Sequence, residues 1–261
     1  MFRTIKKLVL SLLSILGLSF LIWVVLLLNP NMVYSNTTIV DNVSVYHNLS
    51  LDKEAEATIR KALEIISLSE IYDDQLQISL CMNDHNFYPK LHPTPGGTAY
   101  AFLNKTIIYR SKPDIKNNTA EFSWVENNYE LRKYDLTYLL AHEFMHNVQH
   151  DYDSKYQILS TLGKINWKLE GHADYIAREF KNDGLLLDKI EKLLYEENQE
   201  HVGVPVFKIE NGTIQNLAYF KYALLIQYLM EEKQMDFSQI CALDSDLDEL
   251  YADMIEWSQT K

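Results

Sequence analysis

The chain has 261 residues, of which 47% are apolar and only 8 are Gly and 6 Pro, so it can bury the core of one large domain or a two-lobed one. Its formal charge is -12, from 36 acidic against 24 basic side chains. An acidic surface repels a polyanion, which argues against nucleic acid as a partner. The two cysteines, Cys81 and Cys241, are compatible with one extracellular disulfide or with two buried thiols, and both alternatives stay open.

The first 35 residues have the composition of a membrane-targeting segment. Three basic side chains lie within residues 1–7, and residues 8–28 carry no charge. A bilayer is spanned by about 20 apolar residues, which exceeds the apolar region of a cleaved signal peptide. We therefore predict a transmembrane signal-anchor over residues 1–35, with cleavage near Val33 as the alternative. Basic residues stay on the cytoplasmic side, so residues 36–261 are expected to form an extracytoplasmic domain, which would be secreted after cleavage.

The first half of this domain is predicted to mix short strands with one helix. Asp52 can cap that helix, whose apolar residues recur at helical spacing. In chain order, the patterns predict a polar stalk or early strand over 29–50, an amphipathic helix over 53–69, a strand over 76–82, a turn-rich loop over 92–97, one bent strand or two strands about a turn over 98–110, and a polar loop over 112–128.

The second half is predicted to be mostly helical. The expected elements are helices over 134–150, 167–181, 184–198 (capped by Asp183 or Gly184), 215–233 and 247–258, with a short strand over 204–209. Strands first and helices afterwards indicate an α+β fold. We expect a small mixed or antiparallel sheet packed on the helix over 134–150, followed by a mostly helical C-terminal part.

The helix predicted over 134–150 carries the sequence His-Glu-Phe-Met-His, an HExxH pattern. Residues four apart share one face of a helix, so His142 and His146 can offer two imidazoles to one metal ion, with Glu143 beside them to handle a proton. That arrangement can turn water into a nucleophile at neutral pH. Asp135 lies at the expected start of this helix and is predicted to cap it.

The next predicted helix, over 167–181, offers a further metal ligand. A catalytic zinc takes three protein ligands, and the third must come from another element because one helix cannot surround a metal. Glu170 follows His146 at a distance that lets the chain turn back near Ser154 or Gly163. We predict that Glu170 is the third ligand of one Zn2+. Asp174, four residues later, is predicted to hydrogen-bond the free nitrogen of a ligand histidine.

These residues resemble the gluzincin metallopeptidases, the clan that includes thermolysin. The resemblance consists of HExxH followed on the next helix by Glu-Gly-x-Ala-Asp-Tyr, and it is strongest to the small peptidase MA-like members of the clan. It extends over roughly residues 95–235. It implies a zincin-like domain that cleaves peptides or proteins, with His142, His146 and Glu170 as zinc ligands and Glu143 as general base.

Two further roles follow from the resemblance. A tyrosine of the helix over 215–233 would stabilise the oxyanion, and Tyr219 is favoured over Tyr222. A strand before the zinc helix would bind the backbone of an extended substrate at its edge, with an ordinary core strand as the alternative. The predicted substrate-binding residues are Gly97, Ala99, Tyr100 and Ala101.

Other interpretations of the same residues stay open. The two HExxH histidines can be surface residues of an amphipathic helix, and Glu170 an ordinary exposed helix charge. His150 and His172 are interpreted as outer-shell or surface groups, with His172 the nearer to the substrate or to the rim of the site. The competing functions are a non-catalytic zinc-stabilised surface binding protein and a zinc hydrolase of another amide bond.

Overall fold

The structure is a computed structural model that describes residues 2–48, 51–82, 96–109, 111–114, 118–122, 132–153, 155, 166–178, 184–200, 205–208 and 214–261. The predicted turn near Ser154 or Gly163, most of the loop over 92–97 and the Asp183 cap lie outside these residues.

A five-stranded mixed sheet forms one side of the domain, in the order β1-β2-β3-β5-β4. Its outer pairs, β1 with β2 and β4 with β5, are antiparallel, whereas β2–β3 and β3–β5 are parallel. The strands are β1 (Asn36–Val40), β2 (Val43–His47), β3 (Ile78–Met82), β4 (Gly96–Tyr100) and β5 (Lys105–Tyr109). The sheet is therefore mixed, and the polar segment over 29–50 contains strands.

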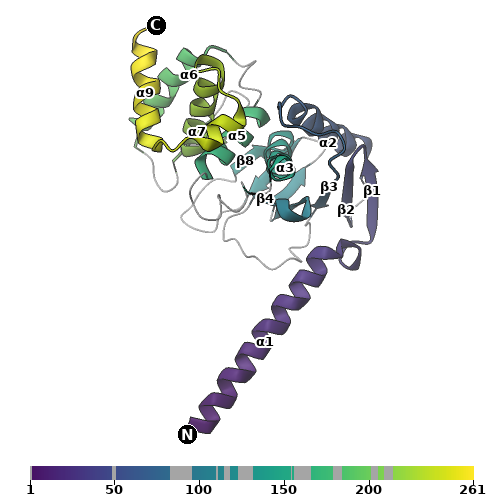
Figure 1. The fold of residues 1–261 in the computed structure, drawn as a ribbon. Coiled ribbons are helices and arrows are strands. Elements are labelled where there is room, and N and C mark those ends of the chain that lie inside the picture. Colours follow the sequence, from purple (N-terminus) through teal and green to yellow (C-terminus); the bar gives the residue numbers. More distant parts are fainter. Residues whose placement is uncertain are drawn as a thin grey trace.

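Helices cover one face of this sheet and make up the C-terminal part, which confirms the α+β prediction. In Figure 1, α3 lies between the sheet with α2 and the C-terminal group of helices. The helices are α2 (Lys53–Ile66), α3 (Leu136–Tyr152), α5 (Asn166–Ala177), α6 (Leu186–Glu197), α7 (Leu217–Gln227), α8 (Phe237–Ala242) and α9 (Leu247–Gln259), and a π-helical turn over Tyr228–Glu232 extends α7.

Side-chain caps explain where two of these helices begin. Asp52 accepts a hydrogen bond from the backbone N–H of Ala55 at 2.9 Å, and Asp135 accepts one from that of Tyr138 at 2.9 Å. Each aspartate satisfies an N–H that has no partner within the helix, as predicted. The start of α6 differs from the prediction, because Leu185 occupies the cap position and no side chain caps it.

The prediction of a loop over 112–128 is wrong in part. Within it and beside it lie the strands of a three-stranded antiparallel sheet, β6 (Ser111–Asp114), β7 (Thr119–Phe122) and β8 (Arg132–Asp135). The strands are short, Pro113 interrupts one of them, and Asn118 adopts a positive φ of 51°, so turn residues obscure the alternation that marks a strand. A two-stranded sheet of β9 (Val206–Lys208) and β10 (Ile214–Asn216) precedes α7.

The segment over 98–110 is two strands about a turn. A 3-10 turn, η2 (Ala101–Leu103), follows β4, and Asn104 with a φ of 47° reverses the chain into β5. Asparagine tolerates this left-handed conformation. Ala101 therefore lies in the turn, where it is fully buried, and is not part of the edge strand as predicted.

Helix α1 (Phe2–Leu28) extends away from the domain as a single long helix (Figure 1). Its segment Ile5–Leu28 is long and apolar enough to cross a membrane, by length and composition. Large apolar side chains such as Leu8 and Phe20 are exposed along it, which is the pattern expected of a helix surrounded by lipid.

A glycine permits the close packing of α5 on α7. A Cβ atom added at Gly171 would lie 2.6 Å from the backbone oxygen of Tyr222 and 2.8 Å from its carbonyl carbon. Backbone atoms cannot give way as a flexible side chain does, so the two helices can approach this closely only with glycine at this position.

Replacing Gly171 by Ala is expected to destabilise the fold by about 1–3 kcal/mol, the usual cost of overpacking. A thermal melt of the purified protein should show Tm lowered by several degrees. Gly17→Ala is the matched control, since nothing lies within 4 Å of a Cβ at that position. Equal melting temperatures for the two variants would contradict this account of the α5–α7 contact.

Candidate metal centre

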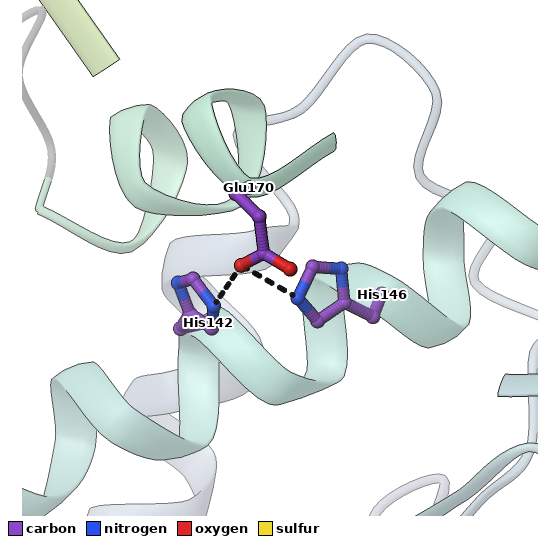
Figure 2. A group of neighbouring side chains, drawn as sticks. All are labelled: His142, His146 and Glu170. Carbon is purple, nitrogen blue, oxygen red and sulfur yellow. Dashed lines mark ion pairs between the residues drawn. The ribbon is translucent and has the colours of Figure 1, made fainter. Parts of the chain in front are cut away.

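Three potential ligands converge where α3 faces α5. Glu170 Oε2 lies 3.2 Å from His142 Nε2 and 3.5 Å from His146 Nε2. One ligand atom from each residue lies within 4.8 Å of the other two. Figure 2 shows the two imidazoles rising from one helix toward the carboxylate that descends from the other. The helical spacing of the histidines and the return of α5 therefore bring all three predicted residues together.

The spacing of these atoms fits a tetrahedral zinc ion. Bonds of about 2.0–2.1 Å to nitrogen and carboxylate oxygen give a tetrahedron with edges of about 3.3–3.4 Å. The measured separations of 3.2 and 3.5 Å match such edges. Two imidazoles and one carboxylate are also a donor set that zinc accepts. The residues present therefore fit the ion.

Hydrogen bonds fix the direction in which both imidazoles point. His142 Nδ1 lies 3.1 Å from Asp174 Oδ1, and His146 Nδ1 lies 2.9 Å from Gln149 Oε1. Because each Nδ1–H donates to an oxygen acceptor, each Nε2 faces Glu170, and Nε2 is the atom that a metal would bind once it has lost its proton. Both rings are thus held in this orientation without a metal.

The charges of the cluster favour a cation. Burial opposes the charged form of His142, but hydrogen bonds to Asp174 and Glu170 outweigh burial and raise its pKa to about 10. Burial also opposes charge on His146, and Glu170 nevertheless raises the pKa of that imidazole. Burial alone would raise the pKa of Glu170, yet His146 and His142 hold it well below its usual range. Protons thus supply the positive charge that this site stabilises.

Asp174 is itself held as a carboxylate by several partners. It is fully buried and accepts hydrogen bonds from the hydroxyl of Tyr138, and at 3.5 Å from Arg178 Nε and from Gln215 Nε2. Burial acts against ionisation, but Arg178 and His142 keep the pKa of Asp174 low. A buried charge needs such compensation, so these partners allow Asp174 to stay anionic behind His142.

Glu143 lies beside the ligands and faces the edge of β4. The residue is 7% exposed, and its carboxylate accepts a hydrogen bond from the backbone N–H of Ala99. Burial raises the pKa of Glu143, while His142 and His146 oppose the rise. A carboxylate of raised pKa is a better proton acceptor near neutral pH. The geometry therefore places a carboxylate of raised pKa between the cluster and β4, the last strand of the sheet among the described residues.

Comparison with known protein families identifies the family of this chain. A protein-family model described as Collagenase, Peptidase_M9, matches residues 72–257, which include all the residues of the cluster. The chain belongs to this family. No curated protein and no solved structure matches the chain. Peptidase M9 is a family of zinc metallopeptidases of the gluzincin type, so the predicted resemblance is confirmed, and within the clan the chain is an M9 protein.

Tyr219 of this M9 chain lies against the candidate metal site. Its ring stacks on the His142 imidazole, with centroids 5.8 Å apart and an interplanar angle of 9°. Glu170 is the main cause, and burial the second, of a raised pKa of Tyr219, so the phenol keeps its proton and can donate it. Tyr222 packs on Tyr219 at 6.3 Å. Of the two candidates, Tyr219 is the one stacked on a predicted metal ligand.

The backbone groups of β4 point in alternating directions along the strand. Ala99 pairs with Thr106 of β5, but its N–H points to Glu143, so this pair is not hydrogen-bonded across the strands. Residues two apart in a strand direct their backbone N–H and C=O groups to the same side. The groups of Gly97 therefore point to the same side as those of Ala99, whereas the groups of Tyr100 point to β5. Gly97 and Ala99 therefore line the side that faces the cluster, and Tyr100 and Ala101 do not.

His172 is not at the rim of the site. It is 0% exposed and its ring stacks on Phe237 at 4.0 Å. Burial, and secondarily His146, lower the pKa of His172 to about 3, so the imidazole is neutral. His172 Nδ1 lies 3.3 Å from Gln149 Nε2, and this makes it a partner of the residue that orients His146. His150 is half-buried in the last turn of α3.

Sequence reasoning missed Gln149, Tyr138 and Arg178. Gln149 accepts from His146 and donates to the backbone oxygen of Leu169 at 2.9 Å, so one amide links α3 to the residue before Glu170. Its position three residues after His146, on the same helix face, is a pattern that could have indicated it. Arg178, four residues after Asp174, follows the same rule, whereas Tyr138 makes a contact between helices that no local spacing reveals.

Proposed function

We propose that this M9 chain is a membrane-anchored zinc peptidase whose zincin-like domain comprises residues 36–261 and lies on the extracytoplasmic side, residues 1–35 being the anchor. The supporting observation is the convergence of His142, His146 and Glu170 at 3.2 and 3.5 Å, with both imidazoles held by Nδ1 partners. These three side chains would hold one Zn2+. When bound, the ion supplies Lewis acidity that activates water and polarises a peptide carbonyl.

The protein's own groups would then direct the proton and the substrate. Glu143 accepts a proton from the attacking water and delivers it to the leaving nitrogen, as its raised pKa and its place beside the ligands allow. The protonated hydroxyl of Tyr219 donates a hydrogen bond to the developing oxyanion. The backbones of Gly97 and Ala99 pair with an extended peptide along the edge of β4.

A chelator test decides the reaction class. The full chain, purified in detergent, is incubated with a mixed peptide library, and mass spectrometry identifies any products. Cleavage that a zinc chelator abolishes and added zinc restores is the expected result. Stoichiometric zinc without cleavage would instead support a non-catalytic binding protein, and hydrolysis confined to other amides would support a hydrolase of another bond.

Zinc binding is expected to release protons and to strengthen with rising pH. With a pKa of about 10, His142 is protonated at pH 7 in the metal-free protein, and the pKa of His146 is raised as well. Zinc binds only the neutral imidazoles, so each protonated histidine must lose its proton. Because the histidine pKa values are raised, competition by protons is greatest at low pH and fades as pH rises toward about 10.

Isothermal titration of zinc at pH 7, in two buffers of different ionisation enthalpy, measures this release. At least about one proton per zinc is expected, with a second contribution from His146. A heat that is independent of the buffer would show that the imidazoles are already neutral and would contradict the proposed charge state.

A further inference from the structure

The last turn of α1 is built into the domain, unlike the rest of that helix. Leu27 is 2% exposed and packs in a cluster with Tyr34, Cys81 and Ile107, whereas its neighbour Leu28 is 53% exposed. Trp23 and Leu26 pack against the same cluster. The end of the apolar helix is therefore part of a hydrophobic core that includes strands β3 and β5.

A buried lysine fixes this end of the helix. Lys105, the first residue of β5, is 5% exposed, and its ammonium donates a hydrogen bond to the backbone oxygen of Leu27. The last carbonyls of a helix lack partners within the helix and carry its negative dipole end, so a cation there is doubly favoured. Without Leu27, the ammonium of Lys105 would lose this acceptor in a buried position.

The connection to β1 is folded too. Pro30–Met32 form a 3-10 turn, and the backbone N–H groups of Val33 and Tyr34 donate to the Pro30 oxygen at 2.8 and 2.9 Å. Tyr34 is 5% exposed. The alternative cleavage site near Val33 therefore lies in a hydrogen-bonded turn packed against the sheet.

The end of α1 buries the second face of the five-stranded sheet. Parallel strands such as β2, β3 and β5 are normally buried on both faces. Leu80 and Met82 of β3 belong to the core beneath α2 and α3, while Cys81 between them faces the cluster of Leu27. Among the described residues, the end of α1 and the turn after it supply most of the apolar cover of that second face, together with Leu103 of η2.

Strand β5 contacts the end of α1 on one face of the sheet and α3, the helix that carries His142 and His146, on the other. Successive side chains of a strand point to opposite faces, so Lys105 meets Leu27 while Thr106 meets α3. Thr106 Oγ1 accepts a hydrogen bond at 2.9 Å from Asn147 Nδ2, whose amide also donates to the backbone oxygen of Glu143 at 3.1 Å. The anchor and the catalytic helix are thus attached to adjacent residues of β5.

We propose that α1 is a retained anchor whose last turn is a structural part of the domain, docked by Lys105 and Leu27 on the second face of the sheet. The domain then lies directly at the membrane surface in a fixed orientation, with no flexible stalk. Retention of the anchor rests on the proposed function, whereas the docking of its last turn goes beyond that function, and neither requires hydrolysis.

The N-terminus of wild-type protein tests retention. The full chain is expressed, extracted from membranes with mild detergent, and its intact mass is measured. A mass that includes residues 2–35 is the expected result. A product that begins near residue 36 overturns the proposal, whether or not the protein cleaves peptides.

Thiol labelling of the same detergent-solubilised protein tests docking. Cys81 is 0% exposed beneath the end of α1, and Cys241 is a second buried thiol in the other cluster that serves as an internal control. Lys105→Met should speed maleimide labelling of Cys81 at least about tenfold, since local opening exposes it, and leave Cys241 unchanged. Lys61→Met, at a 54% exposed side chain of α2, should change neither rate.

A second pair of variants alters only the anchor. Leu27→Ala should speed labelling of Cys81 relative to Cys241, whereas Leu28→Ala, at the exposed neighbour, should not. This pair keeps the test decisive if Lys105→Met fails to fold. Labelling of Cys81 at the wild-type rate in Leu27→Ala would overturn the docking.

Discussion

Replacing Glu143 by Gln is expected to lower kcat/KM for peptide cleavage by at least about 100-fold, the usual scale for loss of a general base. The zinc content should stay at the wild-type level. Glutamine preserves the volume of the side chain, and its oxygen can still accept the hydrogen bond from the N–H of Ala99. What it cannot do is take a proton from water, so the loss should appear in turnover and not in metal binding.

The comparison requires kinetics and metal analysis on the same preparation. Glu64→Gln is a matched control, because Glu64 is an exposed glutamate that pairs with Lys61 at 3.3 Å on α2. That variant should cleave at the wild-type rate. Undiminished cleavage by Glu143→Gln would mean that another group is the base. Loss of zinc from this variant would place Glu143 in the metal-binding set instead.

Much of the site could be predicted from the sequence, because it depends on local properties of helices. The four-residue spacing of the histidines, the Asp135 cap and the four-residue spacing of Glu170 and Asp174 are all properties of helices, which a sequence displays directly. The structure adds that α3 and α5 meet at the site, and that Gly171 lets α5 also lie close against α7.

Contacts between distant segments could not be predicted in this way. Lys105 and Leu27 are 78 residues apart, and no periodicity relates a strand residue to the end of an apolar helix. The strands over 111–135 were hidden by Pro113 and Asn118, because pairing across the sheet, not alternation along the chain, defines them. Ala101 lies in a buried turn, and an alanine in a sequence does not distinguish such a turn from an edge strand.

Replacing Glu170 by Ala is expected to weaken zinc binding by more than the roughly 10–100-fold that loss of an outer-shell partner costs. Glu170 Oε2 lies 3.2 and 3.5 Å from the two imidazole Nε2 atoms, so its removal leaves two neutral donors and no anionic ligand. A smaller effect works in the opposite direction. Without this carboxylate the pKa values of His142 and His146 fall, so protons compete less with the ion.

Competition with a chromophoric chelator at pH 7 measures the affinity, and two further variants define the scale. Asp174→Asn keeps the three ligands but removes the carboxylate behind His142, so its loss should stay within about 10–100-fold. Glu191→Ala, an exposed glutamate of α6, should bind zinc like wild type. The expected order of affinity is therefore Glu191→Ala, then Asp174→Asn, then Glu170→Ala. Wild-type zinc affinity in Glu170→Ala would remove this residue from the ligand set, and the fit of the cluster to a tetrahedral ion would then be coincidental.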